Sequence, residues 1–256
     1  MFRVLFLSLM VMLGSSAFCL AGVQTAQEQV EPAEKTAFVL PHKHSVSCYK
    51  TTPEPVQIVC ILDRSGSMRA LTEDTIGGYN SFLAKQRQEE GRAEVTTVLF
   101  DDKYDKIVEA VPLDKVPELT SKEYYARGMT ALLDAVGRTI VDKVAAMDKE
   151  GICPARRRVL FLIMTDGKEN DSKEYSREAV KAMIEEASKE YGWNFIFMGA
   201  NIDSVAEAGA LGISADHAAD YAHNARGVQQ SFDRMSAAAT EMRETGSVSE
   251  AWKNTP

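Results

Sequence analysis

The segment from Val56 to Ser67, VQIVCILDRSGS, constrains the fold of this chain more than any other part of it. Its mostly apolar, β-rich first half ends abruptly at Asp63, which predicts a buried strand that leads into a polar loop. In that loop Ser65 and Ser67 flank a glycine, so both hydroxyls and the Asp63 carboxylate can converge on one point. Three hard oxygen atoms around one point are typical of a site for a small divalent cation.

Alternating strand and helix patterns continue to the end of the sequence. Strand patterns follow at residues 94–100, 106–113, 158–165, 193–198 and 217–221. Helical spacing of apolar residues predicts helices over residues 76–83, 133–147, 176–187, 205–211 and 228–242. The connection at residues 101–105 is too short for a crossover, so it predicts a hairpin and one antiparallel strand. The sequence therefore predicts a doubly wound (Rossmann-like), mostly parallel six-stranded α/β sheet with one antiparallel edge strand and helices on both faces.

Polar side chains follow four of the predicted strands at the point where each strand ends. They are Asp63, Asp101, Asp166 and Asn201. In doubly wound sheets, ligands bind beyond the carboxyl ends of the strands. We therefore expect the functional chemistry of this chain at that edge of the sheet.

Three short segments together resemble a known family. Asp63-Arg-Ser65-Gly-Ser67 resembles the DxSxS loop of von Willebrand factor A domains, Gly128-Met-Thr130 resembles their threonine loop, and Thr165-Asp166-Gly167 resembles the segment that carries their closing aspartate. The order and spacing of the three segments fit, and the predicted hairpin lies where the family has its antiparallel edge strand. The resemblance covers roughly residues 55–246. It implies a single-domain protein of bacterial type with a complete metal-ion-dependent adhesion site.

By this resemblance, five residues form the metal site: Asp63, Ser65, Ser67, Thr130 and Asp166. The two serine hydroxyls are expected to bind the cation directly, and the threonine directly or through water. The two aspartates are expected to supply charge mostly through water and to hold the serines in place. The expected cation is Mg²⁺ or Mn²⁺, because Mg²⁺ prefers about six oxygen ligands. Each side chain alone also suits an ordinary turn or helix cap, but all five together favour the metal site.

Neutral hydroxyl ligands leave a cation poorly neutralised, so a further position can accept a carboxylate from outside. The leading hypothesis is a protein-binding module, not an enzyme, whose metal captures an Asp or Glu carboxylate of a protein partner. A regulatory or scaffold subunit of a larger bacterial complex is the alternative. A metal-dependent hydrolase with Asp63 or Ser65 as nucleophile is the third hypothesis. No histidine falls in the three motifs, and His217 and His223 lie in a late segment with weak patterning, so no base for Ser65 is evident.

The distribution of charge bears on the kind of partner. A formal net charge of −8 argues against nucleic acid, since no basic block is present to replace phosphate counterions. Five basic residues near the predicted site are expected to form a fringe that favours an acidic ligand: Arg64, Arg69, Lys103, Arg127 and Lys168. We expect Asp101, Asp102 and Asp105 to form a solvated hairpin tip.

Residues 1–21 have the layout of an export signal, with one positive charge, an apolar core and small residues. An uncleaved membrane anchor is the alternative, because the uncharged stretch approaches the ~20 residues that span a bilayer. A misassigned start codon in a cytosolic protein is a second alternative. Residues 22–54 are expected to be a linker or irregular lead-in, and residues 247–256 a C-terminal tail. We expect an exported protein, periplasmic or secreted. If the strands after Cys48 and Cys153 are parallel neighbours, both cysteines lie at the same end of the sheet, and a disulfide between them is a hypothesis that the sequence leaves open.

Overall fold

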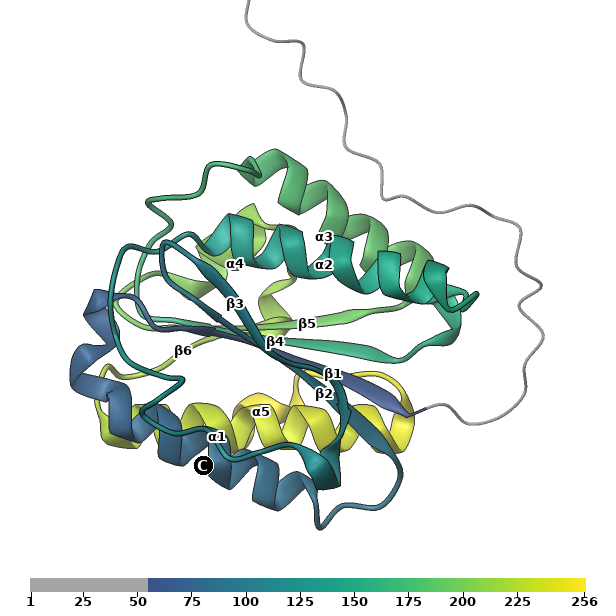
Figure 1. Cartoon of the computed structure of the whole chain (residues 1–256), viewed down its shortest axis with the longest axis horizontal. Helices are drawn as coiled ribbons and strands as arrows, with labels where there is room; N and C mark the ends of the chain where they lie inside the picture. The colour runs from purple at the N-terminus through teal and green to yellow at the C-terminus, as the bar shows by residue number, and fades with distance from the viewer. Residues whose placement is uncertain (1–54) are drawn as a thin grey trace, which may run out of the picture. The chain divides into compact units, whose positions relative to one another are not determined.

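The computed structural model describes residues 55–256, so the expected export signal, the lead-in and Cys48 lie outside the described residues. Six strands form one sheet in the order β3-β2-β1-β4-β5-β6 (Figure 1). They are β1 (Val56–Asp63), β2 (Ala93–Phe100), β3 (Tyr104–Pro112), β4 (Val159–Thr165), β5 (Asn194–Gly199) and β6 (Ala218–Asp220). Every pairing is parallel except that of β3, which runs antiparallel to β2 at one edge. The predicted sheet is therefore confirmed.

Helices cover both faces of this sheet. They are α1 (Thr72–Gln86), α2 (Leu132–Lys149), α3 (Arg177–Tyr191), α4 (Ser204–Ala210) and α5 (Ala225–Thr245). In Figure 1, α1 and α5 lie side by side on one face, whereas α2, α3 and α4 lie on the other. Side chains of Ser176 and Asp203 cap the first turns of α3 and α4, as their residue types favour.

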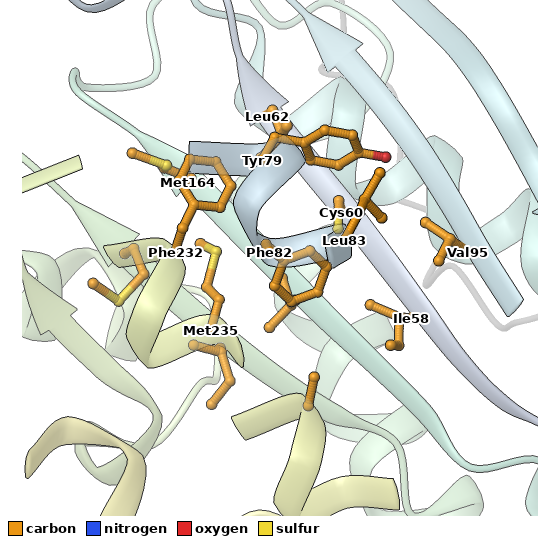
Figure 2. Close-up of a cluster of buried hydrophobic side chains, with 14 of the residues drawn as sticks. Ile58, Cys60, Leu62, Tyr79, Phe82, Leu83, Val95, Met164, Phe232 and Met235 are labelled. Atoms are coloured by element: carbon orange, nitrogen blue, oxygen red, sulfur yellow. The ribbon is translucent and has the colours of Figure 1, made fainter. Parts of the chain in front are cut away.

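Two hydrophobic cores, one on each side of the sheet, explain the long apolar runs in the sequence. The central strands β1 and β4 are buried at every position. Their side chains alternate between the faces, so Cys60 and Leu62 pack toward α1 and α5 (Figure 2), while Ile61 packs toward α2 and α3. A strand that is covered on both faces needs apolar residues at nearly every position.

The two helices on the first face approach each other closely. A Cβ atom at Gly78 of α1 would lie only 2.2 Å from Cδ2 of Phe232 in α5. Figure 2 shows the Phe232 ring and Met235 of α5 in the same core as Phe82 of α1. Glycine at position 78 therefore lets the last helix pack tightly against the first.

The segment after α5 packs on the same domain. Val248 and Trp252 are buried in the core that α1 and α5 share. The residues expected as a C-terminal tail thus contribute to the core, because burial of an apolar aromatic ring away from water stabilises the folded state. Among residues 55–256, no helix has the length and apolar composition to cross a bilayer.

Candidate metal centre

The candidate site begins where β1 and β4 end side by side. Leu62 is paired with Met164, so the next residues, Asp63 and Thr165, leave the sheet at the same level. The Asp63 carboxylate accepts hydrogen bonds from the backbone N–H of Ser65 at 2.7 Å and from the Thr165 hydroxyl at 2.6 Å. Both of its oxygen atoms are therefore used to hold the start of the loop.

The side chains of the serine loop meet the aspartate that follows β4. The Oγ atoms of Ser65 and Ser67 are 3.0 Å apart. Ser67 Oγ also donates to Oδ1 of Asp166 at 2.5 Å, although the two residues are 99 positions apart in the sequence. The parallel pairing of β1 and β4 thus brings two of the predicted ligand segments into direct contact.

Thr130 lies beside this cluster and is held there by the loop after β4. Its backbone N–H donates to Oδ1 of Asn170 at 2.8 Å, and its carbonyl accepts from the Asn170 N–H at 3.0 Å. A Cβ atom on Gly167 would lie 3.9 Å from both Ser67 Oγ and Thr130 Oγ1, so these hydroxyls flank the same glycine. Thr130 is only 3% exposed, and its hydroxyl is an oxygen donor of the kind that a hard cation prefers.

The electrostatics of the cluster favour the binding of a cation. Asp63, Ser65, Thr130 and Asp166 are buried, whereas Ser67 is exposed and opens the cluster to solvent. Burial raises the pKa of the Asp63 carboxyl to about 6, and the nearby Asp166 adds to the rise, although hydrogen bonds from Thr165 and Ser65 oppose it. Removal from water disfavours the negative charge, and a bound cation would offset that cost.

The donor set fits a hard cation such as Mg²⁺. In the part of the chain that the structure describes, no three His, Cys, Asp or Glu side chains gather as a metal-binding group. The candidate ligands are instead three hydroxyls and two carboxylates, all of them oxygen donors. Mg²⁺ accepts few carboxylates and keeps several waters, so these side chains are sufficient to hold it.

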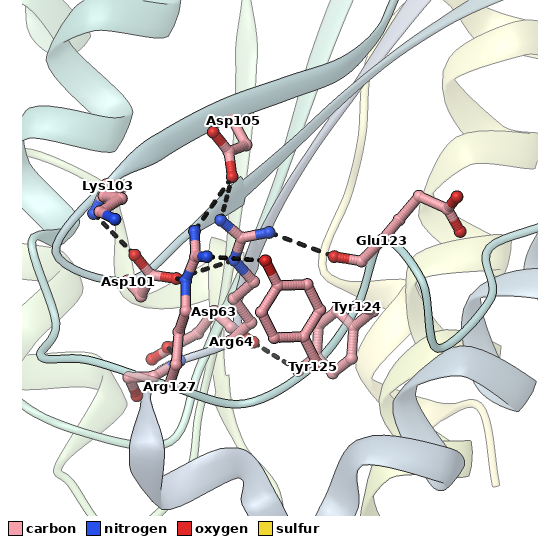
Figure 3. A network of polar contacts seen from close by, with 10 residues as sticks. Asp63, Arg64, Asp101, Lys103, Asp105, Glu123, Tyr124, Tyr125 and Arg127 are labelled. Carbon is pink, nitrogen blue, oxygen red and sulfur yellow. Dashed lines mark hydrogen bonds and ion pairs between the residues drawn. The ribbon is translucent and has the colours of Figure 1, made fainter.

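A buried ion-pair network next to the site corrects one prediction. Asp101 is not at a solvated hairpin tip, because its side chain is 0% exposed and accepts from Arg64 at 2.9 Å and from Arg127 at 2.6 Å. Both arginines also contact Asp105, and the ring of Tyr125 lies against their guanidinium groups (Figure 3). The opposite charges that follow the neighbouring strands β1 and β2 were the sequence signal for this pairing.

The same network changes the expected basic fringe. Arg64 is only 2% exposed, and its charge and that of Arg127 are offset by Asp101 and Asp105. These two arginines therefore do not present free positive charge to a ligand. Arg69, Lys103 and Lys168 remain exposed, so the fringe is weaker than the sequence suggested.

A histidine from outside the three motifs reaches the site, although it does not contact Ser65. His223 follows β6, and its Nε2 atom lies 2.8 Å from Oδ2 of Asp166. From the turn after β5, the Asn201 amide lies 3.5 Å from the Asp166 carbonyl oxygen. Sequence reasoning missed His223 because no motif marks it, and only the return of the last loop brings it to the closing aspartate.

Comparison with known proteins gives a likeness of fold alone. No family model and no curated protein matches the sequence. Among solved structures, the pilus adhesin SpaC of Lactobacillus rhamnosus GG matches with a TM-score of 0.57 at 13% identity, over 76% of this chain and 31% of that one. Proximal thread matrix protein 1 of the mussel byssus matches with a TM-score of 0.49 at 14% identity, over 76% of this chain and 47% of that one. A von Willebrand factor type A protein of Catenulispora acidiphila matches with a TM-score of 0.47 at 18% identity, over 74% of this chain and 43% of that one. This chain thus spans less than half the length of each.

Proposed function

We propose that this chain, which has the fold of a von Willebrand factor A domain, is a metal-dependent protein-binding module. In this proposal a divalent cation, Mg²⁺ or Mn²⁺, binds at the cluster after β1 and β4. The ligand groups are the hydroxyls of Ser65, Ser67 and Thr130 and the carboxylates of Asp63 and Asp166. The cation in turn binds an Asp or Glu carboxylate of a protein partner.

One observation carries the proposal: three loops, far apart in the sequence, bring oxygen donors to one point at the edge of the sheet. Ser67 Oγ contacts both Ser65 Oγ and Asp166 Oδ1, and it flanks Gly167 together with the Thr130 hydroxyl. Hydroxyl and carboxylate oxygens gathered in this way form the kind of donor set that a hard divalent cation prefers. A cation at that point would bind all three loops at once.

The exposure of Ser67 indicates how a partner would reach the cation. The two aspartates and Thr130 are buried, while Ser67 is exposed to solvent. Hydroxyl ligands add no negative charge, so a bound cation keeps most of its attraction for an incoming carboxylate. The specificity for one partner then depends on the surface around the cation.

We propose a binding role rather than a catalytic one. The hydroxyl of Ser65 contacts that of Ser67, and His223 contacts Asp166 rather than either serine, so neither serine has an adjacent histidine to act as its base. Turnover of a phosphate or carboxylic ester that requires metal and is lost in Ser65→Ala would contradict this choice. Export, which rests on residues 1–21, and a regulatory role within a larger complex also remain proposals.

The test is capture of a partner from the envelope of the producing cell. We expect the full chain to retain a protein in Mg²⁺, to release it in EDTA and to retain none in Asp63→Ala. The matched control is Asp216→Ala, because Asp216 is exposed and lies outside the site. Capture that is indifferent to both EDTA and Asp63→Ala would defeat the proposal.

A further inference from the structure

The closing aspartate of the candidate site is held from two sides. Its Oδ1 atom accepts from Ser67 Oγ at 2.5 Å, and its Oδ2 atom lies 2.8 Å from Nε2 of His223. A carboxylate can only accept hydrogen bonds, so the Nε2 atom of His223 is the donor and carries a proton. With one partner on each oxygen, the Asp166 carboxylate cannot rotate without the loss of a hydrogen bond.

His223 is presented by a short loop whose geometry does not depend on the imidazole. On one side, Tyr221 is buried and its N–H donates to the carbonyl of Gly199 at 2.8 Å. On the other side, Asn224 caps α5 by accepting from the N–H of Gly227 at 2.9 Å. The loop is therefore anchored at both ends, and removal of the imidazole leaves both anchors in place.

The side of the carboxylate that His223 contacts defines its role. Oδ1 faces the serine hydroxyls, where the cation is proposed to bind, whereas Oδ2 faces the histidine. The imidazole thus lies outside the group of candidate ligands and acts on the metal site through Asp166. Partners of this kind fix the orientation of a ligand, and their loss typically weakens metal binding by about 10–100-fold.

We propose that His223 is a positioning residue of the metal site: its Nε2–H fixes the carboxylate of Asp166 in the orientation that cation binding requires. This inference rests on the proposed function, because it presupposes that the cluster binds a divalent cation. It assigns a role to the loop between β6 and α5, which none of the three sequence motifs includes.

Direct ligation of the metal by the imidazole is the rival interpretation, and the two make different predictions. Imidazole nitrogen suits Zn²⁺, whereas Mg²⁺ strongly prefers oxygen. A positioning residue therefore affects Mg²⁺ and Mn²⁺ alike, and any side chain with a suitably placed N–H can replace it. A nitrogen ligand would affect Zn²⁺ most and Mg²⁺ least.

The test measures metal affinity of the full chain and of four variants. Mn²⁺ binding is followed by the electron paramagnetic resonance signal of free Mn²⁺, and Mg²⁺ and Zn²⁺ binding by competition. The variants are His223→Ala, His223→Met, His223→Gln and, as control, His217→Ala. His217 contacts Ser214 and the Val248 carbonyl rather than the site. Urea unfolding in EDTA identifies the variants that fold, and the Met variant replaces the Ala variant if the latter does not.

We expect His223→Ala and His223→Met to bind Mn²⁺ and Mg²⁺ about 10-fold more weakly or worse. His223→Gln should return to within ~3-fold of wild type, because its amide N–H can replace the imidazole donor. The control should be unchanged. Equal affinities of wild type and His223→Ala would overturn the positioning role alone, as would a loss that Gln does not restore or one confined to Zn²⁺. Absence of Mn²⁺ binding by wild type would overturn the proposed function and this inference together.

Discussion

Asp63 is the residue at which stability and the proposed metal binding oppose each other. Its carboxyl is buried, and burial raises its pKa to about 6. The folded protein therefore binds the Asp63 proton more tightly than the unfolded chain does. Without a cation, the unfolding free energy falls as pH rises from about 4 to about 6, and it stays reduced above that range. Such a cost is expected where a buried group serves binding rather than folding.

Asp63→Asn should therefore stabilise the metal-free protein at pH 7.5. The amide removes the buried charge but keeps only one of the two acceptor oxygens. One pKa unit corresponds to about 1.4 kcal/mol, so the expected gain is at most about 2–3 kcal/mol. The gain should disappear at pH 4, where the wild-type carboxyl is largely protonated in the folded state. The measurement is urea unfolding in EDTA at both pH values. A variant less stable than wild type at pH 7.5 would contradict this account.

The predicted ligand residues and the missed ones differ in how their positions are determined. Asp63, Ser65 and Asp166 follow buried strands directly, so the apolar pattern and the parallel pairing place them at one edge of the sheet. The burial of Asp101 and the approach of His223 to Asp166 instead depend on how side chains and distant loops meet in three dimensions. Local patterns do not contain that information.

At the scale of elements, the arginine network joins two loops of the candidate site to the neighbouring β2–β3 hairpin. Arg64 lies between Asp63 and Ser65 in the first loop, and its guanidinium contacts Asp101 after β2 and the carbonyl of Glu123 (Figure 3). Arg127 reaches the same aspartate from the segment that leads to Thr130. The network thus links the serine loop, the β2–β3 hairpin and the threonine loop through one buried carboxylate.

Asp101→Asn should destabilise the fold. It leaves the Arg64 guanidinium, which is almost fully buried, without its principal counter-charge, and breaking a buried pair costs about 3–5 kcal/mol. The matched control is Asp171→Asn, because Asp171 pairs with the exposed Lys173, and such pairs contribute about 1 kcal/mol or less. Both values come from urea unfolding in EDTA. Equal losses in the two variants would contradict a structural role for the network.

The helices and strands could be predicted from the sequence because the apolar residues that face the core recur at a fixed spacing. Val136, Ile140 and Val144 of α2 follow the helical period, and all are buried. The contact between α1 and α5 could not be predicted, since the close approach of Gly78 to Phe232 joins residues more than 150 positions apart in the sequence. The six-stranded, mostly parallel sheet, the helices on both of its faces and the antiparallel edge could be predicted; the contacts between helices could not.

At the scale of the whole molecule, the side chains that stabilise the fold and the candidate ligands lie in different places. The two cores pack against the faces of the sheet, while the candidate ligands lie in loops at one edge and add little to either core. Ser67, for example, lies on the surface. A change at an exposed position of that edge such as Ser67 can therefore alter binding without disruption of the fold, which is the usual arrangement of sites on doubly wound sheets.

The most direct test of the central claim is the position of a bound cation. Crystals of the full chain grown with Mn²⁺ should show one anomalous-scattering peak about 2.0–2.3 Å from the Oγ atoms of Ser65 and Ser67, on the side that Thr130 flanks. The same peak should be absent from crystals of Asp63→Ala. A peak elsewhere, or none at saturating Mn²⁺ in well-ordered wild-type crystals, would contradict the claim that these five side chains hold a metal.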